Sequence, residues 1–235
     1  MAPSLLSRGR PVDDVGGNAM AARSAGRVRT VAAAGIVLAG GRSSRMGRPK
    51  AWLDWDGTTL LERVCGVVGA VVDGPVVVVR APSQELPPLP AGIETAEDPV
   101  EGRGPLQGIA VGLAAVETRA EVAFVASVDL PFLHEAYVRR VIALLGEHAV
   151  LLPVAHGHHQ PLAAAYRTAL APVVAELIAD GRSRPPDLFA AVDVHRADEA
   201  ELLADPVLRE RDPELRALVN VNTPEEYASA RARVR

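Results

Sequence analysis

The stretch "VAAAGIVLAGGRSSRMGRPK", residues 31–50, decides the fold. Its first nine residues, 31–39, form an uncharged apolar run, which is typical of a strand buried on both faces of a sheet. The run ends in Gly40 and Gly41, where the missing Cβ atoms let backbone N–H groups approach an anion closely. The stretch therefore predicts a buried first strand that runs into a binding loop.

The rest of the chain alternates between strand patterns and helix patterns. Strands are expected at 75–80, 122–132, 149–154 and 161–167, and helices at 59–71, 104–117, 135–147 and 168–181. Thr59 with Glu62 makes a capping box, and a last helix begins at Thr223, with Pro224 first and Glu226 third in it. This alternation predicts an α/β fold with a mostly parallel central sheet covered on both faces.

The domain organisation follows from composition. Residues 1–30 hold Arg, Gly, Asp, Ser and Pro without the apolar core of a signal peptide. We interpret them as a disordered tail, or as sequence upstream of a true start at Met20. Residues 31–235 are expected to form one domain, with a candidate lobe around 150–220 and a proline-rich loop at 82–92.

Charge and cysteine content exclude several classes of protein. The net charge of −4 argues against a general nucleic-acid or membrane-surface binder. No apolar run approaches the ~18 residues of a membrane span. The single cysteine, Cys65, is expected in a helix core; it excludes an intrachain disulfide framework and a multi-cysteine zinc site, and it fits a reducing cytoplasm.

The loop after the first strand is strongly basic in an otherwise acidic chain. Its four positive side chains are Arg42, Arg45, Arg48 and Lys50. Such a cluster favours a polyphosphate ligand, although a solvated arginine loop is the alternative. The loop is not a Walker A motif, because five residues separate Gly41 from Gly47 and the lysine comes three residues later. It contains no Gly-x-Gly either, which excludes the dinucleotide fingerprint.

Lys50 is the only lysine in the chain, beside 24 arginines. An ammonium is a compact point charge, whereas a guanidinium is a wide planar fork. Our hypothesis is that Lys50 neutralises phosphate oxygens where the fork does not fit. The alternative is the chance survival of one lysine in a chain of biased composition.

Asp129 ends the strand expected at 122–132. Ligands of parallel sheets bind at the carboxyl ends of strands, so Asp129 and the Gly-Gly loop should share one edge. A carboxylate at that position suits Mg²⁺, which prefers one or two carboxylates together with substrate phosphates and water. Alternatively, Asp129 caps the turn that precedes Pro131.

"LAGGRSSRMGRPK", residues 38–50, resembles the L-A-G-G/A-x-S-x-R-M-G-x-x-K loop of the MobA-like NTP transferase family, most closely its molybdenum cofactor guanylyltransferases. The cytidylyl-transferring relatives tend to read Ala-Ala-Gly in this loop. Three more segments resemble the same family: "EDPVEGRGPLQGI" (97–109), "SVDLPF" (127–132) and "NVNTPEE" (220–226). The resemblance covers about 31–232 and implies a Rossmann-like three-layer sandwich of the nucleotidyltransferase type.

The resemblance implies that the loop wraps the nucleotide. Leu38, Ala39, Gly40 and Gly41 would contact it, with Leu38 and Gly40 reaching the base and ribose through backbone groups. The residues expected to act in catalysis are Arg45, Lys50 and Asp129. Of these, Arg45 and Lys50 would hold the triphosphate, and Asp129 would bind Mg²⁺.

The other two segments supply the remaining contacts. Asp98 would help to read guanine, and Gly104 and Gly108 would allow a helix to pack closely beside the nucleotide, unless they serve only the helix start. Asn220 and Asn222 would face the acceptor side. Helix capping is the alternative for the asparagines, but the segment that follows them already supplies a cap.

The implied reaction joins GTP and Mo-molybdopterin into molybdopterin guanine dinucleotide and releases pyrophosphate. Its partners would be these two substrates and a molybdoenzyme or cofactor-delivery protein, with no nucleic acid and no membrane. Three alternatives stay open: a cytidylyltransferase that uses CTP, a relative with another phosphate acceptor such as a sugar phosphate or a phospholactate, and a non-catalytic adaptor that delivers the cofactor.

Three histidines lie close together in "HGHHQPL", residues 156–162. His156, His158 and His159 could suggest a metal site, but no cysteine or spaced partner supports one. The family has a H-P-L segment near its pterin side, and here Gln160 interrupts the match. The role of these histidines therefore stays open.

Overall fold

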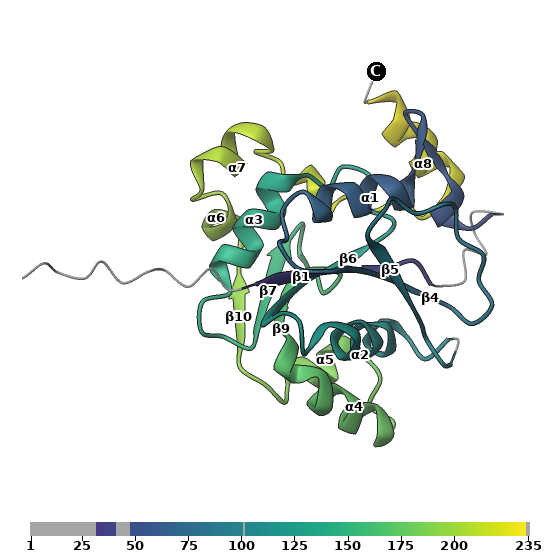
Figure 1. Cartoon of the computed structure of the whole chain (residues 1–235). Coiled ribbons are helices and arrows are strands. Elements are labelled where there is room, and N and C mark those ends of the chain that lie inside the picture. The colour runs from purple at the N-terminus through teal and green to yellow at the C-terminus, as the bar shows by residue number, and fades with distance from the viewer. Residues whose placement is uncertain (1–31, 41–47, 101, 234–235) are drawn as a thin grey trace, which may run out of the picture. The chain divides into compact units, whose positions relative to one another are not determined.

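The computed structural model describes residues 32–40, 48–100 and 102–233, and Figure 1 shows the arrangement of its elements. The strands are β1 (Ala33–Leu38), β2 (Asp54–Trp55), β3 (Thr58–Thr59), β4 (Val76–Arg80), β5 (Ile93–Glu97), β6 (Val122–Ser127), β7 (Val150–Ala155), β8 (His158–His159), β9 (Ala163–Arg167) and β10 (Val194–Ala197). The α-helices are α1 (Leu60–Gly69), α2 (Pro105–Val116), α3 (Glu135–Leu144), α4 (Ala171–Ala179), α5 (Pro185–Phe189), α6 (Glu199–Leu202), α7 (Pro206–Arg211) and α8 (Pro224–Ala232). Three short 3₁₀ helices are η1 (Lys50–Trp52), η2 (Thr168–Leu170) and η3 (Arg216–Leu218).

The central sheet has the strand order β10-β7-β9-β6-β1-β4-β5, with β8 attached to β7. β1 pairs in parallel with β4 and β6, β4 with β5, and β10 with β7. β9 runs antiparallel between β6 and β7. The prediction of a mostly parallel α/β sheet is confirmed, but the reversed direction of β9 has no signal in its apolar pattern.

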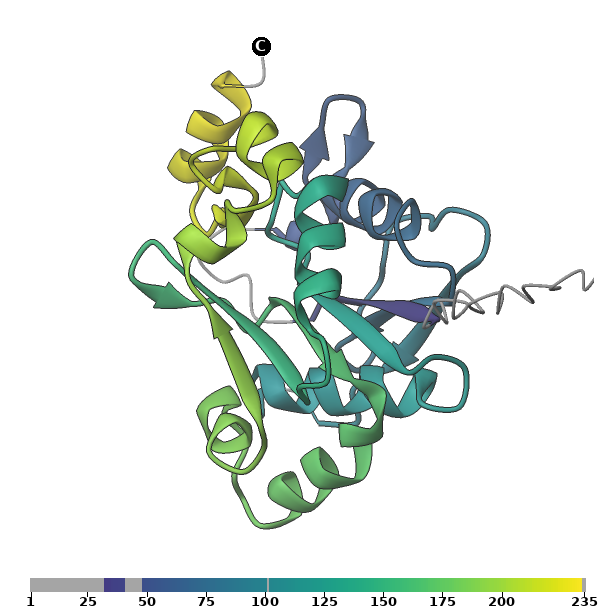
Figure 2. The ribbon, with the colours of Figure 1, turned by 90° about the vertical axis from the view of Figure 1, so that its left-hand side faces the viewer.

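Two apolar cores lie on opposite faces of this sheet, which accounts for the continuous apolar run of β1. Ala33 and Val37 face the core built with α1, α3 and the C-terminal helices, whereas Ala34, Ile36 and Leu38 face the core built with α2, α4 and α5. Figures 1 and 2 show these two helix layers, with α3 and the C-terminal helices on one side. Successive strand residues point to opposite faces, so both sets must be apolar.

Several expected elements are confirmed at slightly different bounds. The capping box of α1 is present, with the Thr59 hydroxyl accepting from Glu62 N and the Glu62 carboxylate accepting from Thr59 N. Thr223 caps α8 by accepting from Glu226 N. Cys65 is buried within α1, as expected.

Other expectations need correction. The candidate lobe around 150–220 is wrong, because β7, β9 and β10 extend the central sheet. β5 was not predicted, since its sequence "IETAE" is mostly polar and it lies at the edge of the sheet. Of the helices in the described part of the chain, none is long and apolar enough to cross a membrane.

Candidate active site

A cavity of about 510 Å³ lies where β1, β4 and β6 end. The registers of these strands align Leu38 with Val79 on one side and with Ser127 on the other, so the three strand ends meet at one edge. The last residue of β1, the two residues after it and the first residue of η1 contribute to the lining: Leu38, Ala39, Gly40 and Lys50. Asp98, Gly104, Gly108 and Asp129 line the cavity from the other segments singled out in the sequence.

Lys50 joins two of those segments by direct contact. Its Nζ lies 2.8 Å from Oδ2 of Asp129 and donates to Oδ1 of Asn222, also at 2.8 Å. The Lys50 and Asp129 side chains are each 16 % exposed, so the pair is shielded from water but open to the cavity. An ammonium with two oxygen partners at this distance places a fixed positive charge at the cavity wall.

Each member of this group is fixed by its own backbone. Lys50 begins η1, whose next residue Ala51 is buried, and Leu53 N donates to the Lys50 carbonyl. Asp129 follows β6, where Val128 N bonds to the Leu38 carbonyl and Val221 N bonds to the Asp129 carbonyl. The three polar groups therefore meet because three separate segments are anchored by the sheet and the core.

The cavity lining also includes the N-terminal end of α2. Gly104 precedes this helix with φ of +93°, a conformation that favours glycine. A Cβ at Gly108 would lie 3.3 Å from a Leu38 methyl, so the glycine allows α2 to pack tightly under β1. The helix N-terminus carries a partial positive charge, which adds to that of Lys50 in attracting an anion.

Asp98 lies just after β5, the edge strand that pairs with β4. Its backbone N donates to the Arg80 carbonyl, and its Oδ1 accepts from Val100 N at 2.9 Å. The carboxylate is half-buried and lines the cavity, so it can accept hydrogen bonds from a ligand. Its contact with the nucleoside part of a ligand stays a prediction.

Sequence reasoning missed Arg80, which ends β4 and also lines the cavity. Its guanidinium pairs with Glu97 at 2.7 Å and donates to the Gln84 carbonyl. The Gln84 amide in turn accepts from Ala81 N and donates to the Ala39 carbonyl, which ties the loops after β4 and β1 together. The rule that ligands bind at strand ends could have found Arg80, because the strand was expected to end there.

Some expected site residues are not placed in the cavity. Gly41 and Arg45 lie outside the described residues. Asn220 is exposed, and in the part of the chain that the structure describes neither Asn220 nor Asn222 is among the cavity residues, although Asn222 contacts Lys50, which is. His156 contacts residues of the C-terminal part of the chain: its N–H donates to the Glu199 carboxylate, and its ring contacts the Glu214 carbonyl.

The side chains around Asp129 suit a hard cation that brings its own ligands. Among the described residues, no group of three His, Cys, Asp or Glu side chains could enclose a metal ion, and this holds for the three neighbouring histidines too. Asp129 offers a carboxylate at the cavity wall, next to the Lys50 ammonium. This arrangement fits Mg²⁺, which takes one or two carboxylates and completes its shell with phosphate oxygens and water.

The sequence of the chain is similar to those of known proteins. The model of the MobA-like NTP transferase domain matches residues 35–195. A Mycobacterium tuberculosis protein described as a probable molybdenum cofactor guanylyltransferase is 42 % identical over 174 residues, which cover 71 % of this chain and 84 % of that protein.

Solved structures show the same fold. The Archaeoglobus fulgidus molybdopterin-guanine dinucleotide biosynthesis protein A aligns with a TM-score of 0.67 at 22 % identity, covering 86 % of this chain and 98 % of that one. The Thermus thermophilus 2-C-methyl-D-erythritol 4-phosphate cytidylyltransferase aligns with a TM-score of 0.60 at 19 % identity, covering 85 % and 97 %. A Rossmann-like sheet with its cavity at the strand ends, matched by the family's model over more than half of the sequence, means that the chain is a nucleotidyltransferase of the MobA-like NTP transferase family.

Proposed function

We propose that the protein transfers GMP from GTP to the terminal phosphate of Mo-molybdopterin, forming molybdopterin guanine dinucleotide and pyrophosphate with Mg²⁺. The observation that carries the proposal is the bridge from Lys50 to Asp129 and Asn222 at the wall of the cavity. It places a cation, a carboxylate and an amide from three separate segments beside a space that can take a nucleotide. Residues 31–235 would form the catalytic domain.

The chemistry needs no nucleophile from the protein. A terminal phosphate oxygen of the acceptor attacks the α-phosphorus of GTP, a new P–O bond forms, and the bond to the bridging oxygen of pyrophosphate breaks. The attacking oxygen is already ionised, so catalysis consists of positioning and charge neutralisation. Lys50 donates hydrogen bonds to the phosphate oxygens, and α2 directs its positive end toward them. Arg45 is expected to assist from the loop.

Asp129 would hold Mg²⁺ at the strand end. When bound, this ion neutralises the developing charge on the phosphate oxygens. The Lys50 ammonium lies 2.8 Å from Oδ2 of Asp129. It therefore compensates the negative charge of this carboxylate until substrate phosphates offer the ammonium other partners. Asn222, held by the same ammonium, would face the acceptor phosphate.

Guanine is favoured over cytosine by two features. The loop after β1 has the Gly-Gly form that resembles guanylyl-transferring enzymes. Asp98 offers a carboxylate that can accept from the N1–H and amino group of guanine, whereas cytosine offers only one amino donor on its pairing edge. The fold similarity to a cytidylyltransferase keeps CTP as the second candidate nucleotide.

The test is pyrophosphate release from purified protein with Mg²⁺, molybdopterin as acceptor, and GTP or CTP in parallel. We expect release with GTP and little with CTP. Release with CTP alone would overturn the base assignment while keeping the mechanism. A sugar phosphate in place of molybdopterin should give no release, and release there would overturn the acceptor.

Asp129→Ala separates an enzyme from a cofactor-delivery adaptor. The variant should lose pyrophosphate release, whereas an adaptor would keep both GTP binding and delivery. Asp193→Ala is the matched control, because this exposed aspartate pairs with His148 next to the first residues of β7 and β10, at the opposite edge of the sheet. The control should release pyrophosphate at the wild-type rate.

A further inference from the structure

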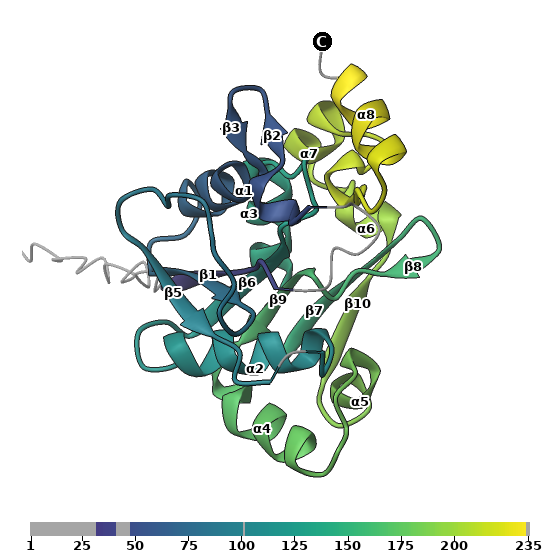
Figure 3. The same cartoon turned by 90° about the vertical axis from the view of Figure 1, so that its right-hand side faces the viewer.

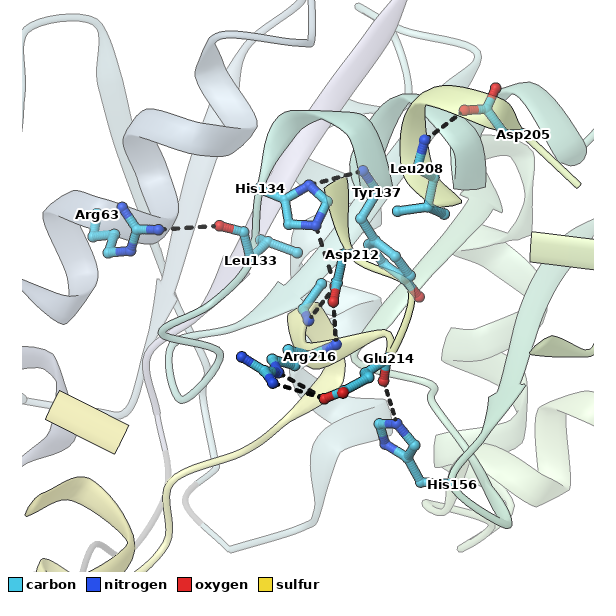
Figure 4. Close-up of polar contacts among 11 residues, drawn as sticks. Arg63, Leu133, His134, Tyr137, His156, Asp205, Leu208, Asp212, Glu214 and Arg216 are labelled. Carbon is cyan, nitrogen blue, oxygen red and sulfur yellow. Dashed lines mark hydrogen bonds and ion pairs between the residues drawn. The ribbon is translucent and has the colours of Figure 1, made fainter. Parts of the chain in front are cut away.

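A buried imidazole–carboxylate pair joins the start of α3 to the C-terminal segment of the chain. His134 Nε2 lies 3.2 Å from Oδ2 of Asp212, and both side chains are at most 10 % exposed (Figure 4). Neither residue lines the cavity. Buried polar pairs are costly to desolvate, so a pair at this place needs a structural or functional reason.

The hydrogen-bond pattern fixes the roles of the two side chains. His134 Nδ1 accepts from Tyr137 N at the start of α3, so the ring proton sits on Nε2 and is donated to Asp212. Asp212 accepts further from Arg216 N at 2.8 Å and from Ala217 N at 2.9 Å. Burial alone would raise the pKa of Asp212. The hydrogen bonds from His134, Ala217 and Arg216 together lower the pKa by more than burial raises it, so it lies below its ordinary value.

This pair closes a ring that includes the active-site bridge. Residues 129–134 run from Asp129 to His134, and residues 212–222 run from Asp212 to Asn222. The two segments are joined at one end by the buried pair and at the other by Lys50, which contacts both Asp129 and Asn222. Between these ends, Val221 N bonds to the Asp129 carbonyl.

The same segments are held from outside by other residues. Arg63 of α1 donates from Nε to the Pro131 carbonyl at 2.6 Å, which fixes the turn after Asp129. His156 contacts the Glu214 carbonyl from the hairpin of β7 and β8 (Figure 4). These contacts anchor each segment to the body of the fold, whereas the His134–Asp212 pair ties the two segments to each other.

We propose that His134 and Asp212 are positioning residues that hold Asn222 on Lys50 and so set the geometry of the bridge beside Asp129. The pair acts through η3. The first two residues of η3, Arg216 and Ala217, donate their backbone N–H groups to the Asp212 carboxylate, and η3 is followed by the residues that lead to Asn222. Both Asp212 and Asn222 lie beyond residues 35–195, which the family's model matches. The catalytic part of the proposal rests on the proposed function.

Two variants of His134 separate its two hydrogen bonds. His134→Asn keeps an acceptor for Tyr137 N, since asparagine is a good helix N-cap, but its side chain is too short to reach Asp212. His134→Gln places an amide N–H close to where Nε2 lies and keeps the bond to Asp212 while giving up the cap. We expect His134→Gln to behave like the wild type and His134→Asn to behave like Asp212→Asn.

The first readout needs no catalysis. Hydrogen exchange of the peptide covering 213–223 reports on the Val221 N–H that bonds to the Asp129 carbonyl. Asp212→Asn and His134→Asn should speed this exchange by about tenfold, and His148→Asn, which removes a solvent-exposed imidazole–carboxylate pair elsewhere, should not. Unchanged exchange in both pair variants would overturn the proposal, whether or not the protein transfers nucleotides.

The second readout is a double-mutant cycle on kcat with Asn222→Ala. Asp212→Asn alone should lower kcat about tenfold, because small displacements of a positioned group are costly. In the Asn222→Ala background the same change should lower kcat less than about twofold, because its target is gone. Equal effects in both backgrounds would show a general structural role and overturn the proposal. Absence of pyrophosphate release from the wild-type protein would overturn the proposed function. In that case the hydrogen-exchange data alone would test whether His134 and Asp212 hold the C-terminal segment in position.

Discussion

The ammonium of Lys50 lies 2.8 Å from the carboxylate of Asp129, and 79 residues separate the two in sequence. Each side chain is 16 % exposed, so neither charge is fully hydrated. At such a position, removal of one partner leaves the other charge poorly compensated. The relationship therefore makes Lys50 and Asp129 sensitive to substitution in different ways, as the first two predictions describe.

Lys50→Arg should lower turnover at least tenfold, which corresponds to about 1.4 kcal/mol of activation free energy. The single Nζ of lysine reaches Asp129 and Asn222 at 2.8 Å each, and a planar guanidinium cannot place one nitrogen in the same position without displacing its neighbours. The measurement is the rate of pyrophosphate release at saturating substrates. Wild-type turnover in this variant would contradict the steric explanation for the lone lysine.

Mn²⁺, used as a probe for Mg²⁺, should bind the free protein weakly and bind at least tenfold more tightly with a non-reactive GTP analogue. In the free protein the metal must displace the Lys50 ammonium from Oδ2 of Asp129, whereas nucleotide phosphates give the ammonium other partners. Titration followed by the EPR signal of free Mn²⁺ measures both affinities. Asp129→Asn should weaken Mn²⁺ binding both with and without the nucleotide, because Asp129 is the ligand in both states. Equal affinities of the wild-type protein with and without nucleotide would argue against this account.

Gly112→Ala should be less stable than Gly66→Ala by about 1–3 kcal/mol, the usual range for overpacking a core. Both substitutions gain helix propensity, so their difference isolates the packing effect. A Cβ at Gly112 would overlap one methyl of Ile36 and lie 3.0 Å from another, whereas a Cβ at Gly66 meets nothing within 4 Å. Urea unfolding of the two variants and the wild type tests this. Equal stabilities would mean that Ile36 adjusts freely.

Cys65 should not react with thiol reagents in the folded protein at pH 8 and should react once the protein is unfolded. Burial raises the pKa of this thiol to about 12, and the nearby Glu62 raises it as well. Because only the thiolate is reactive, the folded protein has almost no reactive form at that pH. A thiol-labelling assay with and without denaturant gives the answer.

The same shift gives a pH dependence of stability. The unfolded thiol ionises near its ordinary pKa of 9.0, and the folded thiol near 12. The folded state therefore binds more protons between these values, and the free energy of unfolding should fall as pH rises from 9 toward 12. Cys65→Ala should flatten this part of the stability curve, and an unchanged slope would contradict the assignment.

Much of the fold could be predicted because local patterns coincide with the tertiary structure. The run at 33–38 is apolar on both faces because both faces are covered, and the ends of β1 and β6 could be placed at one edge since parallel strands share a direction. Asp129 and the loop after β1 were therefore expected together. The polar edge strand β5 and the antiparallel direction of β9 could not be predicted in this way. The spacing of apolar residues indicates neither the position of a strand at the edge of a sheet nor its direction.

The contact between Lys50 and Asn222 could not be predicted from the sequence patterns. Asn222 was expected on the acceptor side, and nothing local relates it to a lysine 172 residues earlier. Its position depends on the buried side chains of Leu218 and Val221 and on the buried Asp212, which together seat the C-terminal segment against α3. In Figure 3, α8 follows this segment and lies beside the β2–β3 hairpin, where Arg231 pairs with Asp54 at 2.9 Å.

The large sequence separation between Lys50 and its partners has a consequence for the order of events during synthesis. The strands β1, β4, β5 and β6 can pair once the chain has grown past residue 127, yet Lys50 gains Asn222 only after a further long segment has emerged. Contacts this distant form late, because loop closure must precede them. A nascent chain that has already paired these strands therefore still lacks the contact between Lys50 and Asn222, which forms only after the C-terminal segment has emerged.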